Sequence, residues 1–340
     1  MKKTFLVAAM ALALMNGSAL AQETFKIGLS NGWVGSEWRT QMIEEAQAAA
    51  DAWKDRGVTV ELVIQSSDVD VQGQIGAVRN MINEGVNAII INPNSPTAFD
   101  PIFAQAKEAG ILVVATDAEV SSPDAIYVGI DQTDYGRKGC QWLADTLEHK
   151  GNVVTINGVA GHPANEMRAT GCTEALSQYP DIKVVNAANA NWDQAQGQQT
   201  MQNLLATYPD INGVYVQDGM AAGAWRAIEA AGKTADIAAT GEVRKDFLDL
   251  WSSNNYTSAA SVNPPGVMAS ALNVAVLRLQ GNEFKDGVFG GVYGNAVFLD
   301  IPFIDNTNLA DAVAAADGKP GHWSATQVLS VDDAKARFFK

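Results

Sequence analysis

The side chains of this chain that could bind a ligand are carboxylates, amides, guanidinium groups and indoles, and they follow soon after short apolar runs. They are Glu37, Trp38, Arg39, Asn92, Asp117, Asp131, Arg168, Trp192, Asp218, Glu242 and Asn263. Carboxylates accept hydrogen bonds, amides donate and accept them, and a guanidinium donates through a rigid fork. A sugar or polyol presents hydroxyls that do both, together with C–H faces that an aromatic ring can cover. The mixture therefore predicts a site for a small polyhydroxylated ligand, which would reject analogues lacking the hydroxyls.

Several of these residues also have a purely structural interpretation. Asn92 precedes a proline, which is common turn chemistry. Asp117 and Asp131 could be helix caps, and Trp38 lies on a helical apolar stripe that could face a core. Arg168 could be a surface residue of a helix. The prediction of a binding site therefore depends on the whole set and on no single member.

Patterns typical of enzymes and metal sites are missing from the sequence. The three histidines, His149, His162 and His322, are far apart and lack metal-ligand spacing. There is no Gly-x-Ser-x-Gly motif, and the glycines after the first apolar run do not fit Gly-x-Gly-x-x-Gly. We expect no metal, no cofactor and no catalytic residue. A secreted carbohydrate-active enzyme remains the alternative, because two carboxylates in a cleft could hydrolyse a glycoside.

Two kinds of element must position these side chains, because short Val- and Ile-rich runs alternate with longer amphipathic runs. The predicted strands are 25–30, 58–65, 88–92, 112–116, 126–129, 152–157, 182–187, 213–216, 236–240 and 258–262. The predicted helices are 36–54, 72–83, 98–109, 134–147, 164–179, 193–208, 219–231 and 265–280. Such alternation predicts an α/β fold with parallel sheets. One sheet of ten strands would be at the upper limit of common size, so we expect two sheets and two lobes. We expect the ligand beyond the carboxyl ends of the strands.

The first residues have the pattern of a signal peptide. Lys2 and Lys3 precede an apolar run over 5–15, which is too short to span a bilayer, and 19–21 is a small-x-small cleavage pattern. We expect residues 1–21 to be removed and the mature protein to be periplasmic; an N-terminal anchor is the alternative. Removal lowers the 23 Lys+Arg to 21 against 38 Asp+Glu, a net charge of −17. That surface repels nucleic acid and anionic lipid.

The chain has two cysteines, Cys140 and Cys172. In an oxidising compartment an even pair predicts a disulfide. Two buried thiols that pack as small hydrophobic groups are the alternative.

Several segments together resemble the type I periplasmic sugar-binding proteins, the ribose- and galactofuranose-binding family of ABC importers. They are KIGLSNGWVGSEWRTQMIEEAQ, AIIINPNSPTAFDPIFAQAKEAGILVVATDA, YVGIDQTDYGRKG, INGVAGHPANEMRATGC, MQNLLATYPDINGVYVQDGMAAGAWRAIEAAGK and ASVNPPGVMASALNV. The resemblance covers nearly the whole mature chain, although the stretch after Asp305 lies beyond it. It implies two Rossmann-like lobes joined by a three-segment hinge, with the ligand in the cleft. We expect an N-terminal lobe of 22–130 plus 263–297 and a C-terminal lobe of 131–262 plus 298–340.

The resemblance also implies site residues and partners. Family positions fall on Trp38, Asn92, Asp117, Arg168, Trp192 and Asn263. Glu37 stands where the ribose-binding pattern has an aromatic residue, Ala118 stands where it has an arginine that Arg39 could replace, and Glu242 is a shifted candidate. The implied ligand is a small neutral sugar or polyol, and the implied partner is an ABC transporter permease that a monomer would serve. A ligand-sensing subunit for a chemoreceptor is the alternative. A DNA-binding repressor of related fold would need a helix pair where the export signal stands.

Overall fold

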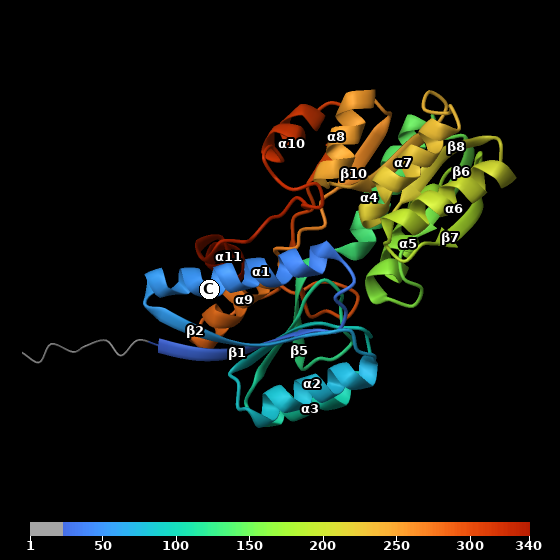
Figure 1. The fold of residues 1–340 in the computed structure, drawn as a ribbon. Coiled ribbons are helices and arrows are strands. Elements are labelled where there is room, and N and C mark those ends of the chain that lie inside the picture. The colour runs from blue at the N-terminus through green and yellow to red at the C-terminus, as the bar shows by residue number, and fades with distance from the viewer. Residues whose placement is uncertain (1–22) are drawn as a thin grey trace, which may run out of the picture.

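The chain folds into two α/β lobes in a computed structural model that describes residues 23–340 (Figure 1). The expected signal peptide, residues 1–21, lies outside the described residues. Each lobe is built on a six-stranded sheet with helices on both faces. The predicted α/β fold of two lobes is therefore confirmed. Within residues 23–340 no helix is both long and apolar enough to cross a membrane.

The first sheet has the strand order β11-β5-β4-β3-β1-β2, and all its pairs are parallel. Its strands are β1 (Glu23–Asn31), β2 (Val58–Ser66), β3 (Ala88–Asn92), β4 (Leu112–Ala115), β5 (Ala125–Ile130) and β11 (Ala296–Leu299). Its helices are α1 (Glu37–Ala52), α2 (Val71–Asn83), α3 (Asp100–Glu108), α9 (Val267–Leu279) and α11 (Val331–Phe338). A short 3-10 helix, η1 (Trp53–Arg56), follows α1. Every residue of β3 is buried, as in a parallel strand covered on both faces.

The second sheet has the order β12-β10-β9-β8-β6-β7, in which only β12 runs antiparallel. Its strands are β6 (Gly151–Asn157), β7 (Ile182–Asn189), β8 (Ile211–Val216), β9 (Ala238–Glu242), β10 (Ser258–Ser261) and β12 (Phe303–Asp305). Its helices are α4 (Gln132–Thr146), α5 (Pro163–Leu176), α6 (Gln194–Thr207), η2 (Asp218–Met220), α7 (Ala221–Ala230), α8 (Lys245–Asn254) and α10 (Leu309–Ala315). Cys140 of α4 and Cys172 of α5 form a disulfide inside this lobe.

The lobes are joined by four crossings where three were expected. Three of them lie between β5 and α4, between β10 and α9, and between β11 and β12. The fourth is the stretch after α10, which returns to the first lobe and ends in α11. There Ser324 pairs through its backbone with the Gln41 side chain of α1, at 3.0 and 3.1 Å. Thr326 bonds Glu45 of the same helix.

The placement of 298–340 in the second lobe was therefore wrong for the end of the chain. Leu329, Ala334, Phe338 and Phe339 are buried in the core that α1 and α9 form in the first lobe. Their apolar side chains remove more surface from water there than an exposed end would. The end of the chain thus belongs to the first lobe, and the chain crosses between the lobes once more than the resemblance implied.

Candidate functional site

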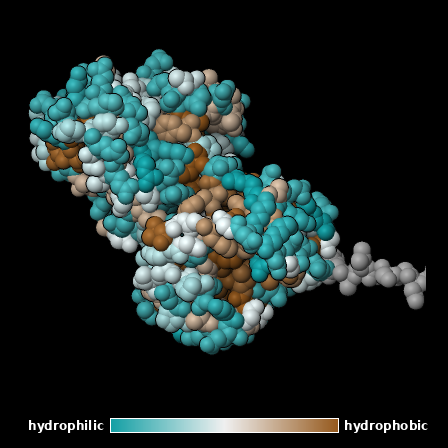
Figure 2. Space-filling view, turned by 180° about the vertical axis from the view of Figure 1, so that it is seen from behind, coloured by the Kyte–Doolittle hydropathy of each residue, from teal (hydrophilic) through white to brown (hydrophobic). Residues whose placement is uncertain are grey.

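A cleft of about 940 Å³ separates the lobes, and a narrower inner pocket adjoins it. Trp33, Ser36, Trp192 and Arg244 line both, so the two spaces are continuous. Seen from behind, the lobes are separate masses that meet at a narrower waist (Figure 2). The inner pocket lies at the carboxyl ends of strands from both sheets, the place where open α/β sheets bind ligands.

The first lobe supplies a guanidinium paired with a carboxylate. Arg39 of α1 lies 3.6 Å from Asp117, measured from Nη2 to Oδ2. Asn92, at the end of β3, donates from Nδ2 to the same carboxylate oxygen at 3.0 Å. Burial raises the pKa of Asp117, and the charges of Arg39 and Arg168 oppose that rise. Both members of this pair line the inner pocket, whereas Asn92 is fully buried behind it.

The second lobe supplies a matching pair. Arg168 of α5 lies 2.7 Å from Asp218, measured from Nη1 to Oδ1, and only 1% of Arg168 is exposed. The guanidinium also lies 4.2 Å from the ring centroid of Tyr135, within cation–π range. Burial is the largest influence on the pKa of Arg168 and lowers it, but Asp218 and its neighbours outweigh it, so the pKa is raised. Arg168 therefore remains a cation at the pocket wall.

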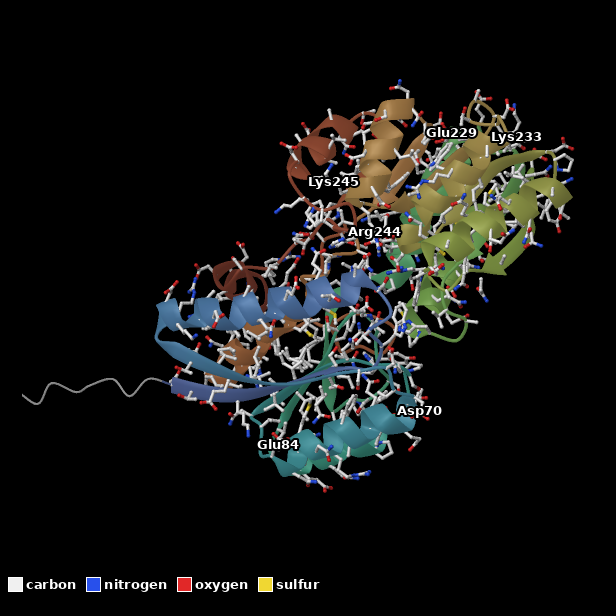
Figure 3. The ribbon with its side chains drawn as sticks, viewed as in Figure 1. Asp70, Glu84, Glu229, Lys233, Arg244 and Lys245 are labelled. Carbon is white, nitrogen blue, oxygen red and sulfur yellow. A yellow bond between two sulfur atoms is a disulfide. The ribbon has the colours of Figure 1, made fainter. Side chains whose placement is uncertain are left out.

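A third pair completes the charged lining. Arg244 donates from Nε to Glu242 Oε2 at 3.1 Å. Burial raises the pKa of Glu242 to about 8, against the opposing charge of Arg244. Figure 3 shows Arg244 on the side of the second lobe that faces the first. With a pKa of about 8 the Glu242 carboxyl is mostly protonated at neutral pH, so this pair adds the Arg244 cation to the two guanidinium–carboxylate pairs.

Three indoles border the inner pocket. Trp38 of α1 is almost fully buried, and its Nε1 donates to the Asn263 carbonyl at 2.8 Å. Asn263 lies in the crossing between β10 and α9, and its amide nitrogen is 3.4 Å from Asp218 Oδ1. Trp33 and Trp192 come from opposite lobes, with their ring centroids 6.4 Å apart. Trp192 donates to Gln217 at 3.2 Å, which fixes its ring at the mouth of the pocket.

Strained backbone marks this region independently of the side chains. Asp117, Trp192 and Asp218 have φ angles of 65°, 57° and 50°, in the left-handed region that non-glycine residues seldom adopt. Such conformations cost of order 1–3 kcal/mol each and cluster where a structure must aim particular groups. All three of these residues line the inner pocket.

The structure brings most, but not all, of the predicted residues to the inner pocket. Trp38, Arg39, Asp117, Arg168, Trp192, Asp218 and Asn263 line it. Asn92 and Glu242 lie behind the lining, each bonded to a residue that lines it. Glu37 is exposed on the outer cleft beside His322. Asp131 caps α4 by accepting from Asp134 N at 2.9 Å, the alternative interpretation that its sequence position allowed.

Sequence reasoning missed three residues of the site. Trp33 and Arg244 line the inner pocket, and Gln132 bonds both Asp117 and Arg168. Trp33 and Arg244 stand in the strand-end segments that supplied the other candidates, so a wider reading of those segments would have included them. Gln132 carries no sequence signal, because its role depends on contacts between distant segments. Within residues 23–340 no group of His, Cys, Asp and Glu side chains could hold a metal ion.

Comparisons with known proteins agree with this architecture. A family model described as a periplasmic binding protein domain matches residues 27–283. The xylitol-binding protein of Mycolicibacterium smegmatis is 32% identical over 249 residues, which is 72% of this chain and 71% of that protein. The galactofuranose-binding protein of Escherichia coli is 31% identical over 68% of this chain and 74% of that protein.

A solved structure gives the same result for the fold. It is an ABC transporter periplasmic solute-binding protein from Actinobacillus succinogenes with bound D-allose. It is 26% identical, superposes with a TM-score of 0.71, and covers 85% of this chain and 99% of its own. The two-lobed fold, the family match and these relatives lead to one assignment: the chain belongs to the type I periplasmic binding protein family.

Proposed function

We propose that this protein is the periplasmic solute-binding protein of an ABC importer, and that it binds a small neutral sugar or sugar alcohol between its lobes. The observation that carries the proposal is the pairing of a guanidinium with a carboxylate in each lobe, Arg39 with Asp117 and Arg168 with Asp218, around one pocket. The relatives named for xylitol, galactofuranose and D-allose support the ligand class.

A neutral, hydroxyl-rich ligand suits this charge arrangement. In each of the pairs Arg39–Asp117 and Arg168–Asp218 the cation already has a carboxylate beside it, so neither guanidinium needs an anionic ligand as its partner. A hydroxyl can donate to a carboxylate and accept from a guanidinium at the same time. Such charge-assisted hydrogen bonds contribute about 1.5–3 kcal/mol each. Several hydroxyls on one ligand could thus bond both pairs at the same time.

Binding acts through closure of the lobes in this proposal. Asp117, Arg39 and Trp38 hold the ligand from the first lobe, and Asn92 holds the Asp117 carboxylate in place. Arg168, Asp218 and Trp192 hold the ligand from the second lobe, with Asn263 at a crossing and Glu242 behind Arg244. Glu37 and Asp131 make no contact with the ligand. A ligand that touches both lobes favours the closed state by its differential affinity for that state.

The remaining parts of the proposal concern location and partners. The signal peptide over 1–21 is removed, and the protein acts as a monomer in the periplasm. The closed lobes present a surface to the membrane permease of the importer, which receives the ligand unchanged. The protein is therefore a binder with no enzymatic activity, no cofactor and no nucleic-acid partner.

A thermal-shift screen followed by calorimetry tests this function. Purified protein is screened against pentoses, hexoses, furanoses and polyols, because a ligand at 100 times its Kd stabilises the native state by about 2.7 kcal/mol. We expect one sugar or polyol to bind with 1:1 stoichiometry and to be recovered chemically unchanged. Binding confined to charged metabolites would refute the neutral-ligand proposal, and conversion of the sugar would establish the enzyme alternative.

A further inference from the structure

Gln132 is a fully buried amide at the first crossing between the lobes. It is the first residue of α4 and follows Asp131, the residue that caps this helix after β5. Its backbone thus belongs to the start of the second lobe, while β5 belongs to the first. A buried amide must satisfy both its donors and its acceptor, or it costs stability.

The side chain of Gln132 makes one strong contact to each half of the site. Its Nε2 donates to the backbone carbonyl of Asp117, in the first lobe, at 2.7 Å. Its Oε1 accepts from Arg168 Nε, in the second lobe, at 2.7 Å. The primary amide makes both contacts because its nitrogen donates and its oxygen accepts. The amide is therefore a direct link between the two halves of the pocket.

Each end of this link needs a positioning group. Asp117 has a φ of 65° and returns to ordinary backbone unless its neighbours hold it there. Arg39 and Asn92 hold its carboxylate, and Gln132 holds its carbonyl. Arg168 is aimed from three directions, by Asp218, by the ring of Tyr135 and by Gln132.

We propose that Gln132 is a positioning residue that couples the two lobes: it sets the Arg168 guanidinium against the Asp117 segment, so that one orientation of the lobes presents both groups to the ligand. The affinity measurement that tests this inference rests on the proposed function, whereas the measurement of the distance between the lobes does not. Without the amide, Arg168 Nε and the Asp117 carbonyl are both buried without a partner, and the relative orientation of the lobes is less narrowly defined.

Two variants separate the two ends of the link. Gln132→Met has a similar length and loses both contacts. Gln132→Glu keeps an acceptor for Arg168 but presents a second acceptor to the Asp117 carbonyl, beside a carboxylate oxygen that lies 3.4 Å from the native amide nitrogen. The matched control is Gln178→Met, because Gln178 is exposed, lies just after α5, and its side chain bonds only the Glu174 carbonyl of that helix, at 3.4 Å.

Affinity is the first readout, with xylitol, D-allose and D-ribose as probes. For whichever probe the wild type binds, both Gln132 variants should bind about tenfold more weakly, because the Arg168 guanidinium and the Asp117 segment are no longer held in the one orientation that presents both to the ligand. Gln178→Met should bind like the wild type. Gln132→Glu keeps its contact with Arg168, so it serves as the folded variant if Gln132→Met does not fold.

The distance between the lobes in ligand-free protein is the second readout, and a residue that only stabilises the fold would not change it. Spin labels at Glu84→Cys and Ala230→Cys report this distance; Glu84 and the neighbour of Ala230, Glu229, mark the two lobes in Figure 3. We expect a broader distribution for the Gln132 variants than for the wild type and Gln178→Met.

Unchanged affinity together with an unchanged distance distribution in both Gln132 variants would overturn the inference. If the wild type binds no sugar or polyol in the thermal-shift screen, the proposed function fails and the affinity readout goes with it. The ligand-free distance then still tests Gln132 by itself, and identical distributions would overturn its role.

Discussion

Replacement of Arg168 by methionine should lower the free energy of unfolding and, separately, weaken ligand binding. The guanidinium is 1% exposed, and its loss leaves Asp218 as a buried carboxylate without its partner at 2.7 Å. Breaking a buried pair in this way costs about 3–5 kcal/mol of the free energy of unfolding. Loss of a charge-assisted hydrogen bond to the ligand costs a further 1.5–3 kcal/mol, roughly ten- to hundredfold in Kd.

A second substitution separates the two effects. In the double variant Arg168→Met with Asp218→Asn, no uncompensated charge remains, so most of the lost stability should return while the affinity stays low. Arg168→Lys keeps the charge near Asp218 but lacks the fork that reaches Gln132. It should therefore be nearly as stable as the wild type and still bind weakly.

Urea denaturation measures the first effect, and calorimetry with the sugar found in the ligand screen measures the second. If Arg168→Met binds the sugar with wild-type affinity, Arg168 does not contribute to ligand binding. Arg168→Met with an unchanged unfolding midpoint would show that the pair with Asp218 contributes nothing to folding, contrary to the geometry.

Three further predictions concern other parts of the molecule. Alanine at both Cys140 and Cys172, which are 32 residues apart, should lower the free energy of unfolding by about 3–4 kcal/mol through chain entropy; reductant should then have no further effect, and denaturation in its presence and absence checks this. Burial raises the pKa of Glu119 from 4.5 to about 7 in the native state. Between pH 4.5 and 7 the native state keeps a proton that the unfolded state has lost, so the free energy of unfolding of the wild type should fall with rising pH, compared with that of Glu119→Gln. Parallel pH profiles of unfolding for the two proteins would contradict this. Trp192→Ala should weaken sugar binding about tenfold in calorimetry, whereas Trp192→Phe keeps an aromatic face and most of the affinity; equal losses in both variants would argue against contact through the ring face.

Local sequence predicted the repeating elements well. All ten predicted strands correspond to β1–β10, because Val- and Ile-rich runs between amphipathic helices carry a strong periodic signal. The strands β11 and β12 were missed, with only four and three residues, and so were α8, α10 and α11. Elements as short as β12 and α10 gain their stability mostly from the lobe that they join, which no local window contains. The ten-residue α8 is as long as α7, so its length does not explain why it was missed.

The sequence predicted most of the residues of the candidate site, but not which of them pair with one another. Residues that follow strands had to gather at the carboxyl edges of the sheets, so Asp117, Arg168 and Asp218 were candidates from their positions, and the family resemblance supported Asp117 and Arg168 as well. Their pairing was not, since Arg39 and Asp117 are far apart in sequence. Asp131 follows a strand in the same way and is nevertheless a helix cap, because the chain turns there into α4.

The alternation of strands and helices, the polar residues at strand ends and the family likeness could all be predicted from the amino-acid sequence, because each depends on residues close together along the chain. Which side chains contact one another was known only from the folded protein. Trp38 bonds the Asn263 carbonyl across 225 residues, Gln132 joins Asp117 to Arg168, and the last helix returns to the first lobe. These contacts depend on the packing of whole lobes and on the angle between them, quantities that no local pattern of residues encodes.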